Sequence, residues 1–107
     1  MTKKIKDGPY KTYYDNGRFF REGTYKYDEK DGLWKSYYDN GQLEREGTFK
    51  DGKLNGPFKT YWDNGKLRSE GTFKDGKING LWKYYWENGQ LWTKEIFEDG
   101  EFLETVE

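Results

Sequence analysis

Apolar and polar residues alternate with a period of two along most of the chain, between short turn dipeptides that contain glycine. This alternation is typical of a strand with one buried face, whereas an amphipathic helix repeats about every 3.6 residues. The dipeptides favour type I′ hairpin turns, because asparagine, aspartate and glycine accept a positive φ. We therefore expect strands joined by two-residue hairpins, and no helix. The turns are Asn16-Gly17, Asn40-Gly41, Asn64-Gly65 and Asn88-Gly89, together with Asp51-Gly52, Asp75-Gly76 and Asp99-Gly100.

The turns recur every 24 residues and divide the chain into units that begin at a glycine. The second unit is GLWKSYYDNGQLEREGTFKDGKLN and the third is GPFKTYWDNGKLRSEGTFKDGKIN, which share 16 of 24 positions. Such a period predicts stacked copies of one supersecondary unit in a single repeat domain over 1–107. The expected units are 8–31, 32–55, 56–79 and 80–100, with a C-terminal capping strand over 101–107.

A two-residue turn at each Asn-Gly fixes which residues lie opposite one another on paired strands. Apolar pairs, opposite-charge pairs and rings that cover a glycine result in the first three units, which supports this register. The predicted pairs are Tyr38 with Leu43, Lys35 with Glu46, and Trp34 with Gly47; Trp62 with Leu67, Lys59 with Glu70, and Phe58 with Gly71; Tyr14 with Phe19, and Tyr10 with Gly23. The Asp51-Gly52 turn likewise places Phe49 opposite Leu54.

Each unit holds two residues more than two equal strands and two tight turns require. Either the register slips by about 7 Å per unit, or a bulge near Asn55-Gly56 and Asn79-Gly80 absorbs the excess. We expect an open sheet, with closure of the first strand onto the last as the alternative. In the fourth unit Lys94 lies opposite Lys83, and Glu95 replaces the glycine opposite Trp82, which indicates a cap.

The alternation gathers most of the rings on one face of the predicted sheet. Its expected members are Trp34, Tyr38, Leu43, Phe49, Leu54, Phe58, Trp62, Leu67, Phe73, Ile78, Trp82, Trp86 and Leu91. The opposite face is expected to carry Lys35, Glu44, Glu46, Lys59 and Glu70, with a row of tyrosines at Tyr13, Tyr37, Tyr61 and Tyr85.

Composition narrows the range of functions. The 107 residues include 19 basic and 20 acidic side chains, so no charge excess favours nucleic acid. With 32% hydrophobic and 36% charged residues, disorder would be the usual expectation, but rings make up 21% of the chain and supply the packing. The absence of Cys and His removes disulfides, thiolate metal sites and the commonest general base. We expect no metal, no cofactor and no catalytic residue.

The residues quoted above form a unit, G-x-W/F-x-x-Y-Y/W-x-N-G-x-L followed by E-G-T-F-x-D-G-K, that resembles the MORN-repeat variant common in bacterial proteins. The likeness covers Gly8 through about Gly100. It implies an all-β fold: an elongated, twisted, single-layer antiparallel meander of β-hairpin repeats, open and solenoid-like. It also implies binding or assembly, since bacterial relatives are often labelled antitoxin components and other MORN proteins are scaffolds. The first unit departs at Tyr27 to Asp31, which lacks the Asp-Gly turn.

A single-layer sheet hides an aromatic face only if it curls or if a partner covers it. We therefore predict a protein-interaction or scaffold module, of antitoxin type or otherwise, whose partner is another protein, such as a cognate toxin, or a second copy of the chain. The predicted partner-binding residues are Trp34, Tyr38, Phe58, Trp62, Trp82 and Trp86, with Tyr37, Tyr61 and Tyr85 on the charged face. The alternatives are that the rings form the only core, or that they bind a carbohydrate, choline or a lipid headgroup at the cell surface.

Other polar patterns have simpler explanations. Aspartates at or before the glycine turns bond locally to the backbone, and the repeated lysines lie opposite glutamates, so neither predicts a calcium site or membrane lipid binding. No apolar run approaches the about 18 residues of a membrane span, and no signal peptide follows Met1, so a cytoplasmic location is the default expectation. A surface or periplasmic location would require a preceding segment.

Overall fold

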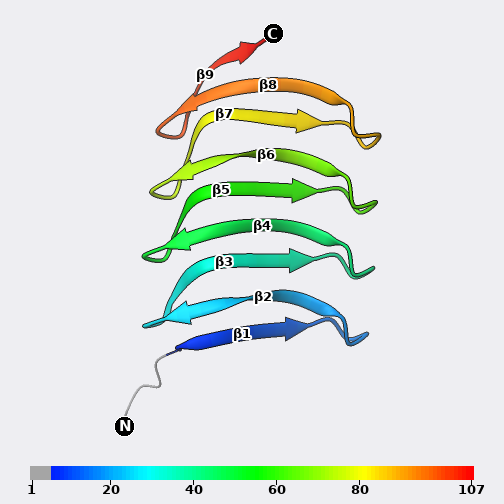
Figure 1. Cartoon of the computed structure of the whole chain (residues 1–107), viewed down its shortest axis with the longest axis vertical. Coiled ribbons are helices and arrows are strands. Elements are labelled where there is room, and N and C mark those ends of the chain that lie inside the picture. Colours follow the sequence, from blue (N-terminus) through cyan, green and yellow to red (C-terminus); the bar gives the residue numbers. More distant parts are fainter. Residues whose placement is uncertain (1–5) are drawn as a thin grey trace.

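The computed structural model describes residues 6–107, which form a single antiparallel sheet of nine strands (Figure 1). The strands follow one another in chain order, and β1 and β9 lie at opposite ends of an open sheet. The molecule measures 56 × 34 × 16 Å, so it is one layer thick. The all-β, elongated meander expected from the repeat is thereby confirmed. The strands are β1 (Gly8–Tyr13), β2 (Phe19–Lys26), β3 (Glu29–Tyr37), β4 (Leu43–Lys50), β5 (Lys53–Tyr61), β6 (Leu67–Lys74), β7 (Lys77–Tyr85), β8 (Leu91–Glu98) and β9 (Glu101–Val106).

The Asp-Gly dipeptides form the predicted turns along the left-hand edge of Figure 1. Both turn residues have a positive φ, for example 52° at Asp51 and 78° at Gly52, as a type I′ turn requires. The first unit forms the same turn without glycine, because Tyr27 and Asp28 take φ values of 51° and 67°. The departure that the sequence shows there therefore changes the residues of the turn but not its geometry.

The Asn-Gly turns differ from the prediction. The Gly41 N–H donates to the Tyr38 carbonyl at 2.9 Å, and the Tyr38 N–H donates to the Gln42 carbonyl at 2.8 Å. Gly41 has a φ of 89°, whereas Asn40 is not among the described residues with positive φ. This is a three-residue loop, a type I turn closed by a glycine bulge, and the two-residue type I′ turn expected here was wrong.

The longer loop changes the pairing next to it. Leu43 lies opposite Tyr37 and not Tyr38, and the register shifts between Ser36 and Tyr37. Paired residues share a face of the sheet. Leu43, Leu67 and Leu91, which were expected among the rings of Trp34, therefore lie on the opposite face. The corrected pairs are Tyr13 with Phe19, Tyr37 with Leu43, Tyr61 with Leu67, and Tyr85 with Leu91.

Farther from these loops the predicted register is confirmed, including Lys35 with Glu46 and Phe49 with Leu54. The two additional residues of each unit are absorbed by an irregularity in the pairing of β4 with β5, between Gly47 and Phe49. Gly56 lies on the bulged side with a φ of 111°. Of the two alternatives, the bulge and not a steady slip of register is therefore correct.

The core consists of rings that lie on glycines. Trp34 and Trp82 are each only 4% exposed. A Cβ atom built on Gly71 would come within 2.2 Å of the Trp82 ring, and one on Gly23 within 2.1 Å of the Trp34 ring. Each indole also donates a hydrogen bond to a backbone carbonyl, from Trp82 to Thr72 at 3.1 Å. Close approach to glycine thus lets a one-layer sheet bury two large side chains.

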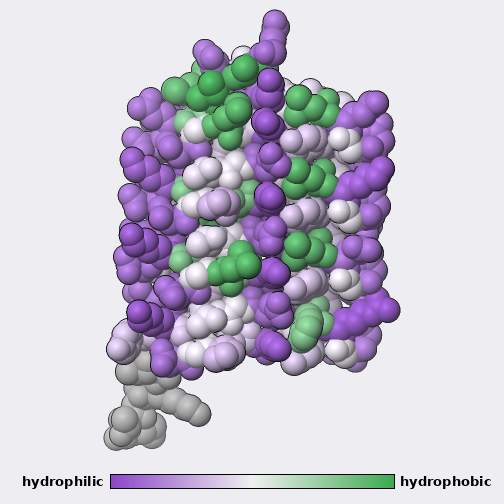
Figure 2. Space-filling model, in the orientation of Figure 1, coloured by the Kyte–Doolittle hydropathy of each residue, from purple (hydrophilic) through white to green (hydrophobic). Residues whose placement is uncertain are grey.

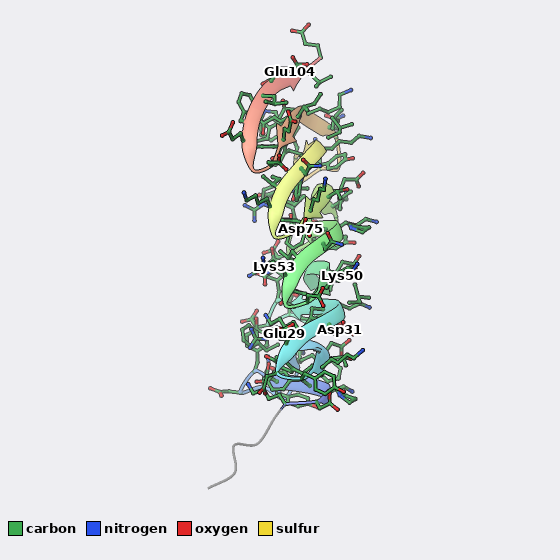
Figure 3. The ribbon with its side chains drawn as sticks, turned by 90° about the vertical axis from the view of Figure 1, so that its left-hand side faces the viewer. Glu29, Asp31, Lys50, Lys53, Asp75 and Glu104 are labelled. Carbon is green, nitrogen blue, oxygen red and sulfur yellow. The ribbon has the colours of Figure 1, made fainter. Side chains whose placement is uncertain are left out.

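Both rows of turns, the Asn-Gly loops and the Asp-Gly turns, carry repeated hydrogen bonds between units. Asn40 accepts from the Gln42 N–H at 2.8 Å and donates to the Asp63 carbonyl of the next unit at 3.0 Å. Asn16 and Asn64 make the same pair of bonds one unit earlier and one unit later. Figure 3 looks onto the other edge, where Glu29, Lys50, Lys53 and Asp75 lie beside the Asp-Gly turns and side chains project from both faces of the layer.

Candidate functional site

The face of Trp34 and Trp82, which we call the ring face, has three parallel rows of side chains that cross the strands. A polar row lies in the middle, and each of its members is paired with the next across adjacent strands. Its members are Thr12, Arg21, Ser36, Arg45, Thr60, Ser69, Tyr84 and Thr93. Aromatic rows flank it: Tyr10, Trp34, Phe58 and Trp82 on one side, and Tyr14, Tyr38, Trp62 and Trp86 on the side of the Asn-Gly loops.

The first aromatic row is closely packed. The Trp34 ring centroid lies 5.0 Å from that of Tyr25, with the rings edge to face. Trp82 makes the same kind of contact with Phe73 at 5.5 Å and lies 6.1 Å from Phe58. Such pairs contribute about 0.5–1.5 kcal/mol beyond the area they bury. This row therefore supports the alternative in which rings form the core, for Trp34 and Trp82 above all.

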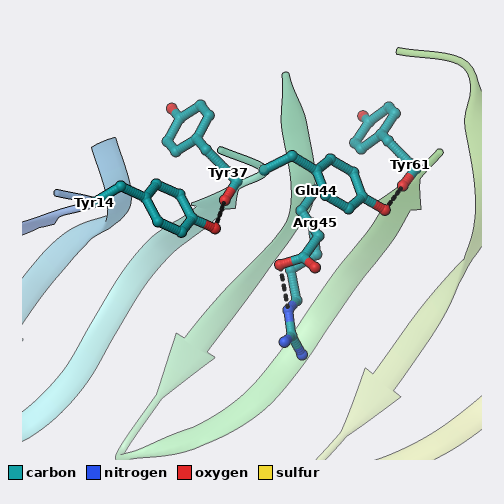
Figure 4. Close-up of polar contacts among 6 residues, drawn as sticks. Tyr14, Tyr37, Glu44, Arg45 and Tyr61 are labelled. Carbon is teal, nitrogen blue, oxygen red and sulfur yellow. Dashed lines mark hydrogen bonds and ion pairs between the residues drawn. The ribbon is translucent and has the colours of Figure 1, made fainter. Parts of the chain in front are cut away.

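The second aromatic row ties each unit to the next. The Tyr14 hydroxyl donates to the Tyr37 carbonyl at 2.6 Å, and the Tyr38 hydroxyl donates to the Tyr61 carbonyl at 2.7 Å (Figure 4). In the third unit the Trp62 indole donates to the Tyr85 carbonyl at 3.2 Å. These bonds hold the outer ends of the side chains against the next unit, and Tyr14, Tyr38 and Trp62 stay half-buried.

The last members of this row are the most exposed. Trp86 is 49% exposed and Trp92, on the next strand, is 58% exposed. Their ring centroids are 4.8 Å apart. Trp92 also lines a groove of about 490 Å³ on the ring face, with Trp62, Tyr38 and Tyr84 among its other walls. Trp92 thus lines the groove, and Trp86, whose ring contacts that of Trp92, lies beside it with about half of its surface exposed to solvent.

The sequence matches the MORN repeat variant over residues 6–27, 30–51, 54–75 and 78–99. Together the four segments cover more than half of the chain, and each spans one pair of antiparallel strands. The chain belongs to this family. No curated protein sequence matches it.

The predicted binding residues of this MORN repeat chain differ widely in accessibility. On the ring face, Trp34 and Trp82 are buried, Tyr38, Phe58 and Trp62 are half-buried, and Trp86 is exposed. Tyr37, Tyr61 and Tyr85 lie half-buried on the opposite face, as expected. Little of either buried tryptophan is available to a partner as the sheet stands. Partner binding by all nine residues stays a prediction.

The tyrosines of the opposite face are held by glutamates. The Tyr61 hydroxyl donates to Glu46 at 2.9 Å, and the Tyr37 hydroxyl donates to Glu22 at 3.2 Å. Burial, followed by the hydrogen bond to Glu46, raises the pKa of Tyr61 to about 12. On the ring face, burial and the charge of Glu95 raise the pKa of Tyr84 to about 12 as well. These hydroxyls are therefore hydrogen-bond donors at neutral pH, not bases.

Figure 2 shows the opposite face, on which a column of hydrophilic side chains separates two sets of apolar groups. Lys35 lies opposite Glu46, as predicted, and also opposite Glu22 on the other neighbouring strand. Across residues 6–107, however, one ion pair is closer than 4.0 Å, and it joins Arg45 to Glu44 at 3.8 Å. The charged side chains of this column are therefore solvated, and their opposite charges attract one another only weakly, without close ion pairs.

Sequence reasoning missed the cations of the ring face. Arg21 and Arg45 belong to its polar row, and Lys30 lies over the rings of Trp34 and Phe49. Glu44, expected on the opposite face, lines the same grooves as Arg45 because the bulge beside the Asn-Gly loop turns it over. Arg21, Lys30 and Arg45 differ from the residues at the same positions of the third and fourth units. This difference is the sequence signal that could have indicated the cations, and a comparison of shared positions does not detect it.

Between Lys6 and Glu107 there is no cluster of three or more acidic side chains placed to hold a metal ion. The same part of the chain contains no helix that is long and apolar enough to cross a membrane.

Proposed function

We propose that this MORN repeat chain is a non-catalytic interaction module that receives a partner protein on its ring face. The observation that carries the proposal is the exposure of Trp86 and Trp92, at 49% and 58%, beside a groove of about 490 Å³. Exposed tryptophans next to a concave surface are favoured anchors in protein interfaces. A cognate toxin, as in an antitoxin role, is one partner that fits this proposal.

The architecture supports the ring face as the docking surface. A sheet 16 Å thick has no second layer to cover its rings, so the side chains that it does not pack against one another stay in water. The buried tryptophans fix the shape of the surface, while the half-buried Tyr38 and Trp62 and the exposed Trp86 present ring area on it. A preorganised surface of this kind lowers the entropy that binding costs.

A carbohydrate or choline site gains no support from the same rings. Such sites need aromatic faces that a sugar or a quaternary ammonium can contact. The centroids of Trp86 and Trp92 are 4.8 Å apart, so the two rings are in direct contact and leave no room for a ligand between them. Protein binding is therefore the function that we put forward.

The test is affinity capture of partners by the immobilised chain, with two matched variants. We expect Trp86→Ala/Trp92→Ala to lose a partner that the wild type and Tyr13→Ala retain, because Tyr13 is exposed to 57% on the opposite face. The double variant should melt lower than the wild type, because about half of each ring is covered in the native sheet, so the capture is done at a temperature at which circular dichroism shows all three proteins folded. Retention of the partner by the double variant would refute the ring face as the docking surface.

A second copy of the chain is the competing occupant. Light scattering coupled to size exclusion, over a concentration series, distinguishes the two cases. A monomer leaves the ring face free for another protein, as we propose. A dimer that the Trp86→Ala/Trp92→Ala variant abolishes would mean that self-association covers this face.

A further inference from the structure

We propose that Arg21, Lys30 and Arg45 form a carboxylate-binding subsite on the ring face, and that it receives an acidic stretch of a partner protein. Apolar residues next to that stretch would lie on the tryptophans of the third and fourth units. This inference rests on the proposed function and specifies the chemistry of the partner.

The pairing of the strands brings the three cations together. Ser36 on β3 lies directly opposite Arg21 on β2 and directly opposite Arg45 on β4. The two arginines are therefore about two strand spacings apart, close to 10 Å, and their side chains are long enough to reach one ligand between them. Lys30 joins them from β3, with Nζ 4.9 Å from the ring centroid of Trp34 and 5.1 Å from that of Phe49. All three line one groove of about 230 Å³.

These cations have little compensating charge. Within residues 6–107, the Nε of Arg21 is buried and has no hydrogen-bond partner. Glu44 is the carboxylate at the groove, and it lies 3.8 Å from Arg45. Burial first, and then the charges of Arg21 and Arg45, lower the pKa of Lys30. Three like charges held together repel one another, so an added carboxylate gains charge-assisted hydrogen bonds and relieves that repulsion.

The cluster is particular to the first two units and is not a property of the repeat. The residues that follow Arg45 at intervals of one unit are Ser69 and Thr93. Those that follow Lys30 are Leu54 and Ile78. The ring face therefore changes along the molecule from a half with three clustered cations to a half dominated by tryptophan rings, in which Arg68 lies over Trp62. A ligand that matches it has its charge at one end and its apolar groups at the other.

One extended protein segment satisfies both halves. Arg45 and Glu44 line the smaller groove and also the larger groove that reaches Trp92, so the two grooves adjoin at these side chains. From β2 to β8 there are six strand spacings, about 29 Å, which an extended chain covers in about nine residues. A polypeptide carries carboxylates and apolar side chains on one backbone. A free anion would contact the cations alone.

The experiment uses a fluorescein-labelled synthetic peptide of about twelve residues: five glutamates, Gly-Ser, and Leu-Trp-Ser-Leu-Trp. Two control peptides replace the glutamates by glutamine, or keep the composition but alternate glutamate with the apolar residues. Fluorescence anisotropy should give the tightest binding for the block peptide. We expect the glutamine peptide to bind about tenfold more weakly, because charge-assisted hydrogen bonds are lost.

The same loss of about tenfold is expected when the chain carries Arg21→Gln/Arg45→Gln. The matched control is Lys59→Gln/Lys83→Gln, which makes the same change in net charge on the opposite face and should alter binding by less than about twofold. Lys30→Leu is a second test variant, because the third unit already has Leu54 at this position. The Arg21→Gln/Arg45→Gln and Lys30→Leu variants should melt no lower than the wild type, since they remove repulsion.

Equal binding of the block and glutamine peptides, or of the peptide to wild type and Arg21→Gln/Arg45→Gln, would overturn the subsite. If Trp86→Ala/Trp92→Ala still weakened binding in that case, the ring face would stand as a docking surface. Absence of any peptide binding would also overturn the inference. So would co-sedimentation with phosphatidylserine vesicles that depends on Arg21 and Arg45 and is not blocked by the block peptide, since it would assign the cations to a membrane surface.

Discussion

Replacing Gly71 by alanine tests whether close approach to glycine is what buries the core rings. Gly71 does not have a positive φ, so an alanine causes no backbone strain there. The added Cβ would lie 2.2 Å from Cδ2 of Trp82 and 2.3 Å from Cε2, where ordinary contacts lie at 3.4–4 Å. The ring must therefore move by more than an ångström.

The magnitude follows from what that movement exposes. A buried tryptophan covers about 150–250 Å², which at about 25 cal/mol per Å² corresponds to about 4–6 kcal/mol. Trp82 is 4% exposed, so nearly all of this is realised in the native sheet. Exposure of about half of the ring gives a loss near 3 kcal/mol, within the usual cost of overpacking. The thermal midpoint should fall by about 10–20 °C.

Unfolding is best followed by far-ultraviolet circular dichroism in urea and on heating, because tryptophan fluorescence would report the perturbed ring itself. Thr72→Ala is the matched control, since Thr72 is the exposed neighbour of Gly71 and its replacement should cost less than about 1 kcal/mol. In a Trp82→Leu background the Gly71→Ala change should cost about 2 kcal/mol less than in the wild type, as expected of residues in contact.

Equal losses for Gly71→Ala and Thr72→Ala would refute this account of the core. So would equal losses for Gly71→Ala in the two backgrounds, because the effect would then not pass through the Trp82 ring.

Three other predictions concern the edges and the buried hydroxyls. Asn64→Ala should cost about 1–2 kcal/mol in urea unfolding, because the side chain loses its bonds to the Lys66 N–H and the Glu87 carbonyl, each 2.9 Å long. At the positive-φ turn positions, Tyr27→Asp should stabilise the fold by about 0.5 kcal/mol and Asp75→Ala should destabilise it by about 1 kcal/mol, since aspartate tolerates this conformation better. The pKa of Tyr61 is raised from 10.0 to about 12 in the folded state, so its hydroxyl contributes fully to the free energy of unfolding below pH 10. This contribution is lost as the pH rises toward 12, and the loss should be smaller in Tyr61→Phe.

Each of these predictions has an outcome that contradicts it. An unchanged urea midpoint for Asn64→Ala would mean that water replaces both bonds without loss. Shifts of the same sign for Tyr27→Asp and Asp75→Ala would show that backbone strain does not decide the turn composition. Identical alkaline unfolding profiles for the wild type and Tyr61→Phe would remove the proposed contribution of that hydroxyl.

Period and turn dipeptides were enough to predict most of this fold. The Asp51-Gly52 turn leaves little freedom, because two adjacent positive φ values suit only a few residues, and its register placed Phe49 opposite Leu54 correctly. Regular alternation then placed Trp34 and Phe58 on one face. The bulge at Gly56 was one of two alternatives, which arithmetic on strand lengths alone left open.

The Asn-Gly loops could not be predicted from the dipeptide, because Asn-Gly fits a two-residue turn and a three-residue turn with a glycine bulge equally well. The choice is made by contacts from outside the hairpin. Asn40 donates to Asp63 in the next unit, and Tyr38 donates to the Tyr61 carbonyl. A one-residue change there moves Leu43 to the other face. The cationic cluster was missed because its members are exceptions to the repeat that guided the prediction.

The stacking of strands along the long axis determines how the molecule responds to tension. The first and last strands lie at opposite ends of the stack (Figure 1), so a pull on the two ends loads the hydrogen bonds between strands in series. Hydrogen bonds loaded in this way break one after another and not all together. Each 24-residue unit that peels off releases about 80 Å of extended chain. The side-chain hydrogen bonds from one unit to the next, such as that from Asn40 to the Asp63 carbonyl, must also break each time a unit detaches.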